Sequence, residues 1–334
     1  MIWFSLLLRL TSRSTTLARR LPSQVLALLL GYVLFPALPC ATAHQAGVAT
    51  HYPLHITDAL GRKLTIQGNP RRIVSLSPSN TESLFALGAG KYVVGVTSFC
   101  DFPMEARAIK KIGGFAASTI SIETIVALKP DLVLAGDRTQ EGVIKALEAL
   151  GVSVISVKVQ SFEELYAQLL QLGEVLNENA EAQERVAYMR QRVQTIVKRS
   201  AGIAKEKRLK VYWEVFDEPL MSCGPRSIIG QQITLAGGIN IFEDLREEFP
   251  QISAEAVIAR NPAVIMGPEL MRARSLSIER LRSRPGWEKL EAVQTGRLII
   301  LPDEPVARPG PRLVEGLTLI AARLYPDIFG DLVP

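Results

Sequence analysis

The sequence predicts an α/β protein with two similar lobes, a long rigid backbone helix that joins them, and a ligand cleft between them. Three observations lead to this prediction: apolar runs of strand length alternate with amphipathic helical segments, one helix-and-strand pattern occurs twice, and no glycine-serine linker separates the copies. Alternating strands and helices are typical of parallel sheets covered by helices. With 334 residues, 48% of them hydrophobic, the chain is long enough for about two domains.

The repeated pattern matches residues 121–135 (SIETIVALKPDLVLA) with residues 253–267 (SAEAVIARNPAVIMG). Each copy has Ser-x-Glu, an apolar helical turn, a proline and then an apolar run of strand type. Proline closes a helix because it lacks the N–H group that the next turn would need. Each copy is therefore predicted to be a short helix that leads into a buried strand, and the two copies indicate two related lobes.

The start of each copy carries the same two polar residues. Ser121 and Ser253 are predicted helix N-caps, and Glu123 and Glu255 lie in the first turn, where the helix dipole favours negative charge. This favourable placement is the simplest interpretation of the two glutamates. Their matching position in two lobes adds another, because exposed carboxylates related by approximate two-fold symmetry suit docking on a symmetric basic partner.

A helical segment separates the two copies. It begins with a capping box, Ser161 followed by Glu164, and its apolar residues then recur at helical spacing with a predicted break at residues 177–179. A helical connection limits how far the lobes can move apart. We therefore divide the chain into residues 1–43, a secretory signal peptide; 52–158, an N-terminal α/β lobe; 159–207, a helical connector; and 208–330, a C-terminal α/β lobe.

Residues 1–43 differ from the rest of the chain. Four arginines precede the apolar stretch VLALLLGYVLFPAL, and Ala-Thr-Ala at 41–43 has the A-x-A form of a cleavage site. We predict export to the periplasm; a retained membrane anchor is the alternative, although the apolar run is short for a span. Loss of the four arginines would leave 34 basic and 33 acidic residues, so nucleic acid is not an expected partner.

The segment SLSPSNTESLFALGAG, residues 75–90, is predicted to be a strand end that turns directly into a helix. Ser79 and Glu82 have the spacing of a capping box, which predicts Ser79 as the N-cap. In parallel α/β proteins the carboxyl ends of strands meet helix N-termini at the crevice where ligands bind. Residues 77–80 are therefore candidate ligand contacts, although every such unit needs a cap, and the segment lacks the glycines of a phosphate-binding loop.

Histidine occurs at positions 44, 51 and 55 and nowhere in residues 56–334. This distribution disfavours a Ser-His-Asp or Cys-His catalytic site and a multi-histidine metal site. We therefore expect no enzymatic activity, no bound metal and no cofactor. A secreted serine hydrolase that uses Ser77 or Ser79 is a remote alternative.

Two cysteines, Cys100 and Cys223, follow the predicted signal peptide. They do not make a disulfide framework. For Cys223 three interpretations stay open: a buried thiol, a disulfide to Cys100 across the cleft, and a contact with the ligand. The separation of the two Cα atoms would decide the second.

Loops at the predicted strand ends carry aromatic side chains. Phe99 lies in SFCDFP, Phe115 follows a Gly-Gly pair, and Phe249 follows an acidic pair. An aromatic side chain in a loop either packs beneath the loop or faces a ligand. Because clefts at domain interfaces are the usual ligand sites, these residues predict a mostly apolar mouth for a cleft that collects the strand ends.

In their order and spacing, these segments resemble the periplasmic substrate-binding proteins of ABC importers in the vitamin B12, siderophore and haem group. The cobalamin-binding proteins are the most similar members. The matching pieces cover nearly the whole chain after the predicted signal peptide: DALGR, RIVSLSPSNTE, VGVTSFCDFP, SIETIVALKPDLVLA, DEPLMSCGPRSII, LAGGINIF, FPQISAEAVIARNP and ARPGPRL.

The resemblance implies two Rossmann-like lobes on a rigid backbone helix. It also implies that a monomeric protein captures cobalamin or a related corrinoid and delivers it to the permease dimer of an inner-membrane ABC transporter. Glu123 and Glu255 match the two family carboxylates that pair with arginines on the two permease subunits. A ferric siderophore or haem receptor of the same group is the alternative, and a surface sensor is a further one.

The resemblance assigns the ligand site as well. Phe99, Phe115 and Phe249 match aromatic positions of the cobalamin-binding proteins, whereas the chain departs from them at Gly136 and Pro305 and near residues 220–221, where larger aromatic residues can occur. Less aromatic surface widens the range of possible ligands. The predicted ligand contacts are Ser77, Pro78, Ser79, Asn80, Phe99, Phe115, Gly136, Leu220, Met221, Phe249 and Glu304.

Overall fold

The computed structural model describes residues 49–333 apart from residue 273, so the predicted signal peptide, residues 1–43, lies outside the described residues. The strands, in chain order, are β1 (Leu54–Thr57), β2 (Lys63–Ile66), β3 (Ile73–Ser75), β4 (Val93–Val96), β5 (Leu132–Ala135), β6 (Val154–Ser156), β7 (Lys210–Asp217), β8 (Leu220–Ser222), β9 (Ile239–Asn240), β10 (Val264–Pro268) and β11 (Leu298–Leu301). The α-helices are α2 (Pro78–Ala86), α3 (Ile122–Ala127), α4 (Glu141–Ala149), α5 (Phe162–Leu176), α6 (Asn179–Ser200), α7 (Ile228–Leu235), α8 (Ala254–Arg260), α9 (Glu269–Arg272), α10 (Ile278–Ser283), α11 (Glu291–Gln294), α12 (Asp303–Val306), α13 (Leu313–Leu324) and α14 (Pro326–Phe329).

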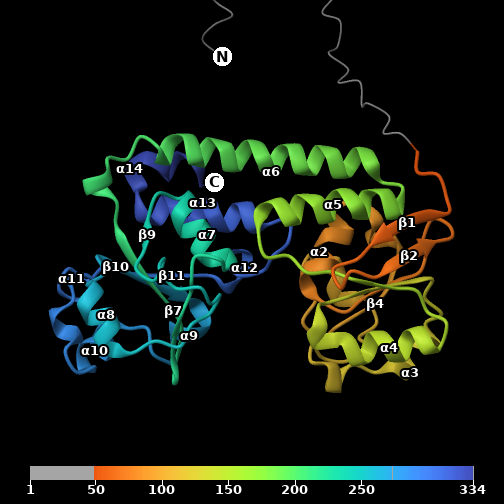
Figure 1. Cartoon of the computed structure of the whole chain (residues 1–334), viewed down its shortest axis with the longest axis horizontal. Coiled ribbons are helices and arrows are strands. Elements are labelled where there is room, and N and C mark those ends of the chain that lie inside the picture. Colours follow the sequence, from red (N-terminus) through yellow and green to blue (C-terminus); the bar gives the residue numbers. More distant parts are fainter. Residues whose placement is uncertain (1–48, 273, 334) are drawn as a thin grey trace, which may run out of the picture. The chain divides into compact units, whose positions relative to one another are not determined.

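The N-terminal lobe is built on a parallel sheet in the order β4-β3-β5-β6. Its strands are short apolar runs, and all residues of β3, β5 and β6 are buried, as expected for a parallel sheet covered by helices. The predicted hairpin is also present, with β1 antiparallel to β2. The strands and helices of this lobe are the orange to yellow-green part of Figure 1.

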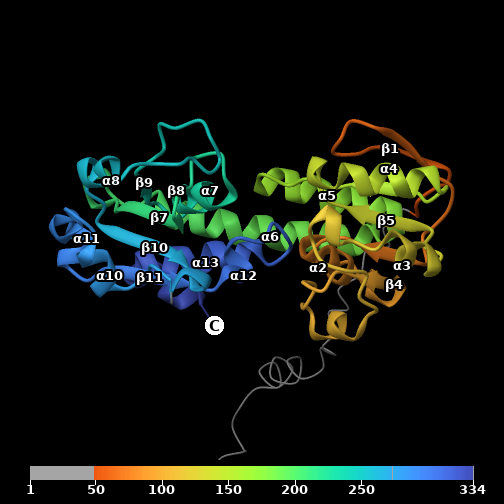
Figure 2. The same cartoon turned by 90° about the horizontal axis from the view of Figure 1, so that it is seen from below.

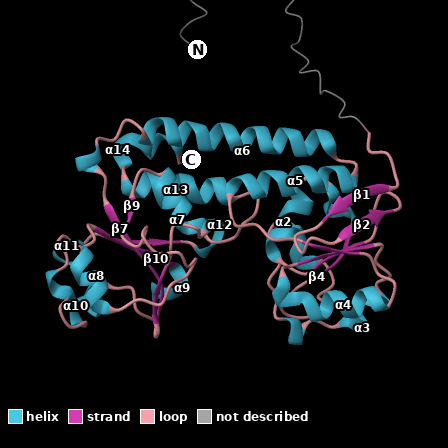
Figure 3. Cartoon of the chain, viewed as in Figure 1, coloured by secondary structure: helices cyan, strands magenta, loops and turns pink. Residues whose placement is uncertain are grey.

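The C-terminal lobe has a second sheet in the order β11-β10-β7-β8, and β9 also pairs with β7. The β10, β11 and β9 pairings are parallel, whereas β8 folds back antiparallel on β7. The two-lobe α/β prediction is therefore confirmed, and Figure 3 shows a set of strands with surrounding helices in each lobe. In both lobes the repeated segment forms the predicted helix and strand, α3 with β5 and α8 with β10.

The caps of the repeat are those that the sequence predicts. Ser121 Oγ accepts a hydrogen bond from the Thr124 N–H at 3.1 Å, and Ser253 Oγ accepts one from the Ala256 N–H at 3.2 Å. Each bond satisfies one of the unpaired donors at a helix start. The duplication thus extends from the sequence to the local geometry.

The connector contains two helices, α5 and α6, separated at the predicted break. Asn177 ends α5 in the left-handed conformation (φ 55°), and its N–H donates to carbonyls of the last turn. The longer helix, α6, packs against α5 of the connector and against α13 and α14 from the C-terminal lobe. Figures 1 and 2 show α6 as the element that extends along both lobes, which is the backbone helix of the prediction.

The start of α2 differs from the prediction. The N-cap is Ser77, whose Oγ accepts from the Asn80 N–H at 3.2 Å, and Pro78 occupies the first helical turn. Proline fits there because its missing N–H would be unpaired in any case. The Glu82 carboxylate does not return to the helix start, because it pairs with two arginines of the C-terminal lobe.

The two cysteines are free thiols, so the cross-cleft disulfide is excluded. Cys100 is buried, with the hydroxyl groups of Thr81 and Thr97 each 3.1 Å from its Sγ. Burial raises the pKa of Cys223 to about 12. Of the three interpretations for Cys223, the buried thiol is correct. Within the described residues, no helix has the length and hydropathy needed to cross a membrane.

Candidate functional site

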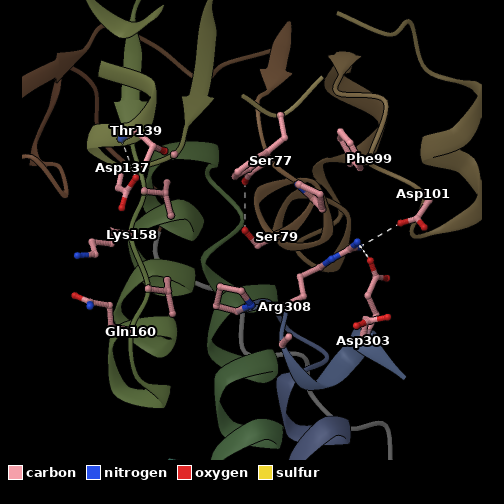
Figure 4. A pocket seen from close by; sticks show the side chains of 18 of the residues that line it. Ser77, Ser79, Phe99, Asp101, Asp137, Thr139, Lys158, Gln160, Asp303 and Arg308 are labelled. Carbon is pink, nitrogen blue, oxygen red and sulfur yellow. Dashed lines mark hydrogen bonds and ion pairs between the residues drawn. The ribbon is translucent and has the colours of Figure 1, made fainter. Parts of the chain in front are cut away.

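A pocket of about 890 Å³ lies between the two lobes, near the upper end of the roughly 300–1,000 Å³ that small-molecule sites occupy. Figure 4 shows part of its lining. The lining residues are Ser77, Pro78, Ser79, Ser98, Phe99, Asp101, Phe115, Gly136, Asp137, Thr139, Val157, Lys158, Val159, Gln160, Glu248, Asp303, Glu304, Ala307, Arg308 and Pro309.

The N-terminal wall consists of the loops that follow the strands of one parallel sheet. Residues 77–79 follow β3, residues 98–101 follow β4, residues 136–139 follow β5, and residues 157–160 follow β6. Parallel strands end at the same edge of their sheet, so four separate loops converge there. This convergence is what the sequence predicts for residues 77–80 and for the loop that carries Phe99.

The C-terminal wall comes from two segments. Residues 303–309 follow β11, and Glu248 lies in a loop whose backbone pairs with the segment just after β8, where the Gly224 N–H donates to the Glu248 carbonyl at 2.8 Å. The pocket therefore needs both lobes. Its two walls also touch directly, because the Gln160 side chain donates to the Glu248 carboxylate.

Two exposed aromatic rings belong to the lining. Phe99 is 58% exposed and Phe115 is 46% exposed. Large apolar side chains that stay accessible in a concave site supply contact area for a ligand. The expectation of aromatic side chains at the cleft is therefore met on the N-terminal wall.

Gln140 holds three pocket segments together, and the sequence reasoning missed it. Its buried amide donates to the carbonyls of Leu76 at 3.1 Å and Phe115 at 3.0 Å, and its Oε1 accepts from the Gly136 N–H at 2.7 Å. Each bond satisfies a backbone group that would otherwise lie unpaired near the pocket floor. No local pattern marks this residue, since its partners lie 4 to 64 positions away.

The charge of the pocket is predominantly negative. Five carboxylates line it, from Asp101, Asp137, Glu248, Asp303 and Glu304, against two cations, Lys158 and Arg308. Arg308 is already paired, with Asp101 at 3.3 Å and with Glu304. Figure 4 shows Arg308 extended toward Asp101, whereas Lys158 lies in another part of the lining. Carboxylates are thus the most numerous charged groups in the lining, beside the hydroxyl groups of serine and threonine residues.

The pocket includes most of the predicted ligand contacts. Four of the predicted residues lie outside this lining: Asn80, Leu220, Met221 and Phe249. The predicted residues that line the pocket are Ser77, Pro78, Ser79, Phe99, Phe115, Gly136 and Glu304.

The four residues outside the lining have other surroundings. Asn80 is buried and its Nδ2 donates to the Ala135 carbonyl at 3.1 Å, so it joins α2 to the end of β5. Leu220 and Met221 belong to β8, an edge strand that pairs with β7, and Leu220 packs on the core of the C-terminal lobe. Phe249 is exposed beside Glu248.

Sequence reasoning also missed residues 157–160, which supply four of the lining side chains. The signal for them was available, since the same rule that selects residues 77–80 applies to the end of any predicted parallel strand. The hydrophobic run at 152–157 predicts such a strand. Glu248 carries no comparable signal, because it enters the pocket through loop pairing.

Glu123 and Glu255, the predicted docking residues, do not line the pocket. Both are exposed in the first turn of their helices, α3 and α8. The structure therefore separates these carboxylates from the pocket and keeps them accessible to a partner.

Comparison with known proteins places this geometry in a family. The family described as "Periplasmic binding protein" matches residues 73–305. An uncharacterized ABC transporter substrate-binding lipoprotein, YvrC of Bacillus subtilis, is 32% identical over 285 residues, which are 84% of this chain and 88% of that protein. A cobalamin-binding protein of Halobacterium salinarum is 27% identical over 287 residues, 85% of this chain and 77% of that protein.

A solved structure shows the same fold. The periplasmic heme-binding protein RhuT from Roseiflexus sp. RS-1 superposes with a TM-score of 0.68 at 26% identity, over 78% of this chain and 99% of that one. Two α/β lobes, a pocket between them and these matches agree with one another. This chain belongs to the periplasmic binding protein family, in the group that serves ABC importers of vitamin B12, siderophores and haem.

Proposed function

We propose that this protein captures cobalamin or a related corrinoid between its two lobes and delivers it to an inner-membrane ABC transporter. The observation that carries the proposal is the make-up of the pocket: exposed aromatic rings together with an excess of carboxylates. A corrinoid offers a large ring surface and a rim of amide side chains. Each property matches one of these two features.

The aromatic part of the match concerns Phe99 and Phe115. Their rings are about half exposed, and covering them with a flat ring system removes apolar surface from water. The loss of aromatic positions at Gly136 and near residues 220–221 leaves fewer such surfaces than the family pattern offers.

The charges favour amide donors over anionic ligands. Corrin amides carry N–H groups that donate to carboxylates, and such charge-assisted hydrogen bonds are stronger than neutral ones. Haem propionates and inorganic oxyanions would instead meet carboxylates of the same sign, which costs free energy. Arg308 is paired with Glu82, Asp101 and Glu304, so the carboxylates left in excess are those of Asp137, Glu248 and Asp303, against Lys158.

The side-chain types in the pocket also favour a corrinoid over haem. Haem iron is held in proteins by His, Cys, Met or Tyr. Among the described residues that line the pocket, none is of these four types. A haem-binding receptor remains the second candidate because a structural neighbour binds haem, and a ferric siderophore receptor is the third.

Delivery requires a docking surface apart from the pocket, and we assign it to Glu123 and Glu255. Each lies in the first turn of an equivalent helix of one lobe, with its carboxylate exposed. Two matching acidic positions suit a permease dimer with an arginine on each subunit, because exposed charges steer encounter and set register. We propose a monomer that works in the periplasm after removal of residues 1–43.

Catalysis is not part of the proposal. The family consists of substrate-binding transport proteins. The hydroxyl group of Ser77 serves as a helix cap, and none of the described lining residues is a histidine that would act as its base. These features weigh against the serine hydrolase alternative.

Calorimetric titration of the purified protein with cyanocobalamin, haem and a ferric hydroxamate tests the proposal. We expect cyanocobalamin to bind most tightly, and mass spectrometry of ligand that copurifies from the periplasm to detect a corrinoid. Binding of haem or the hydroxamate alone would contradict the corrinoid assignment while keeping the receptor function. Binding of none of the three, with no copurified ligand, would refute both.

A further inference from the structure

Five charged side chains form one connected group at the edge of the pocket, which we call the cross-lobe ion cluster. Glu82 and Asp101 belong to the N-terminal lobe, whereas Glu304, Arg308 and Arg312 belong to the C-terminal lobe. The ion pairs between the lobes join residues that are 207 to 230 positions apart in the sequence.

Glu82 is the centre of the cluster. Its Oε1 accepts hydrogen bonds from Arg308 Nη1 and Arg312 Nη2, each at 2.7 Å, and its Oε2 accepts from Arg312 Nε at 2.9 Å. The Glu82 side chain is only 2% exposed. A carboxylate this deeply buried is tolerated because both of its oxygens are bonded to cations.

The two arginines connect this carboxylate to the pocket wall. Arg308 also pairs with Asp101 and Glu304, and Arg312 Nη2 donates to Glu304 at 2.9 Å. Burial lowers the pKa of Arg312, but hydrogen bonds and attraction from Glu82 outweigh this effect and raise it above its usual value. Arg312 therefore stays charged, and its guanidinium also lies 3.6 Å from the centre of the Phe102 ring.

A buried ion pair contributes little net stability, since desolvation offsets the attraction, but its directional bonds restrict geometry. Here the bonded groups lie on different lobes, so the bonds restrict how far apart the two pocket walls can lie. A second contact lies in the other part of the lining, where the Gln160 side chain donates a hydrogen bond to the Glu248 carboxylate. The backbone carbonyl of Gln160 also accepts a hydrogen bond from the Gln231 side chain at 2.6 Å.

We propose that Glu82 is a positioning residue for ligand binding: through Arg308 and Arg312 it sets the separation of the two pocket walls and orients Arg308 within the lining. Glu82 itself does not line the pocket. The geometric part of this inference stands on the ion pairs alone, and its effect on affinity rests on the proposed corrinoid-binding function.

The test uses Glu82→Gln, which keeps the shape of the side chain and removes its charge. Spin labels on Leu150→Cys and Gln294→Cys, exposed positions of the two lobes, report the interlobe distance by double electron–electron resonance; the described native cysteines, Cys100 and Cys223, are buried. We expect a broader distance distribution in Glu82→Gln, which saturating cyanocobalamin narrows again. We also expect at least about tenfold weaker cyanocobalamin binding, mainly through faster dissociation.

Two further variants keep the test decisive. Arg312→Lys retains the positive charge but loses the two-pronged bond to Glu82, so it should show the same changes in weaker form. This variant carries the test if Glu82→Gln fails to fold. Asp244→Asn removes the Asp244–Arg260 ion pair, which lies inside the C-terminal lobe, and should change neither readout.

The outcomes separate this inference from the proposed function. An unchanged distance distribution with wild-type affinity in both Glu82→Gln and Arg312→Lys overturns the positioning role, even if both variants are less heat-stable. A broadened distribution in a protein whose wild type does not bind cyanocobalamin would refute the corrinoid proposal and leave the role of Glu82 in lobe geometry intact.

Discussion

Replacement of Phe99 by alanine tests directly whether the pocket binds a flat ligand. Phe99 is 58% exposed, and a phenylalanine side chain has an area of roughly 150–250 Å², so about 120 Å² is available for a ligand to cover. At about 25 cal/mol per Å², full coverage would contribute about 3 kcal/mol to binding. Partial coverage lowers this value, so we expect Phe99→Ala to weaken cyanocobalamin binding by about 1–3 kcal/mol, or roughly 5- to 150-fold.

The same exposure predicts a small effect on folding. A side chain that is more than half exposed contributes little to the core, so Phe99→Ala should change the free energy of unfolding by less than about 1 kcal/mol. Calorimetric titration with cyanocobalamin gives the affinity, and urea unfolding gives the stability. The two measurements together distinguish lost ligand contact from lost structure.

A matched control is available in the same lobe. Leu150 is 59% exposed at the end of α4 and does not line the pocket. Leu150→Ala should therefore leave cyanocobalamin affinity unchanged. Wild-type affinity in Phe99→Ala, or an equal loss in Leu150→Ala, would refute the reasoning that exposed area in this pocket becomes ligand contact.

Three other predictions concern docking, acid stability and the start of α2. The double variant Glu123→Ala, Glu255→Ala should keep its Tm and its cyanocobalamin affinity while vitamin uptake in cells falls; loss of ligand binding with intact transporter association would reverse the assigned roles. Burial raises the pKa of the Asp58 carboxyl, but hydrogen bonds from Arg62 and from backbone N–H groups outweigh burial and lower the pKa below 3.8. The ionised carboxylate therefore stabilises the folded state above pH 3.8, and this stabilisation is lost as the pH falls through the lower pKa of the folded protein. Asp58→Asn should lower the free energy of unfolding by about 2–3 kcal/mol at pH 7. Urea unfolding should show this difference from wild type becoming smaller below pH 3.8. A difference that does not change with pH would contradict the charge-based account. Ser77→Ala should cost about 1 kcal/mol of unfolding free energy because it removes the observed cap, and an equal or larger cost for Ser79→Ala would favour the original capping prediction.

Features that depend on neighbouring residues were predictable from the sequence. The caps at Ser121, Ser253 and Ser161, the break at Asn177 and the parallel strands follow from patterns a few residues long, and the structure has each of them. These signals are local because a cap bonds within its own first turn and a strand is recognised by its own apolar run. The start of α2 shows where even a local rule fails, since either of two serines could be the N-cap. Pro78 favours the earlier one, Ser77, because proline fits the first turn of a helix.

The pocket was predictable in outline for a related reason. Once the strands are assigned as parallel, their carboxyl ends must meet at one edge, which selects Ser77, Phe99 and Gly136 without knowledge of the packing. The rule does not extend to Leu220 and Met221, which lie outside this lining, because β8 runs antiparallel to β7 and the rule applies only to parallel strands.

Tertiary structure decided which distant side chains meet. Glu82 carries the spacing of a capping residue, yet its partners lie 226 and 230 positions away, and the cysteines remain apart as free thiols although the sequence permits a bridge. The sequence by itself determined the elements, their caps and the edge where loops converge, because these depend on contacts within a few residues. The partners of Glu82 were decided only when the two lobes packed together, and those of Gln140 only when the loops of the N-terminal lobe packed, since a buried polar group bonds whichever group the fold brings within reach.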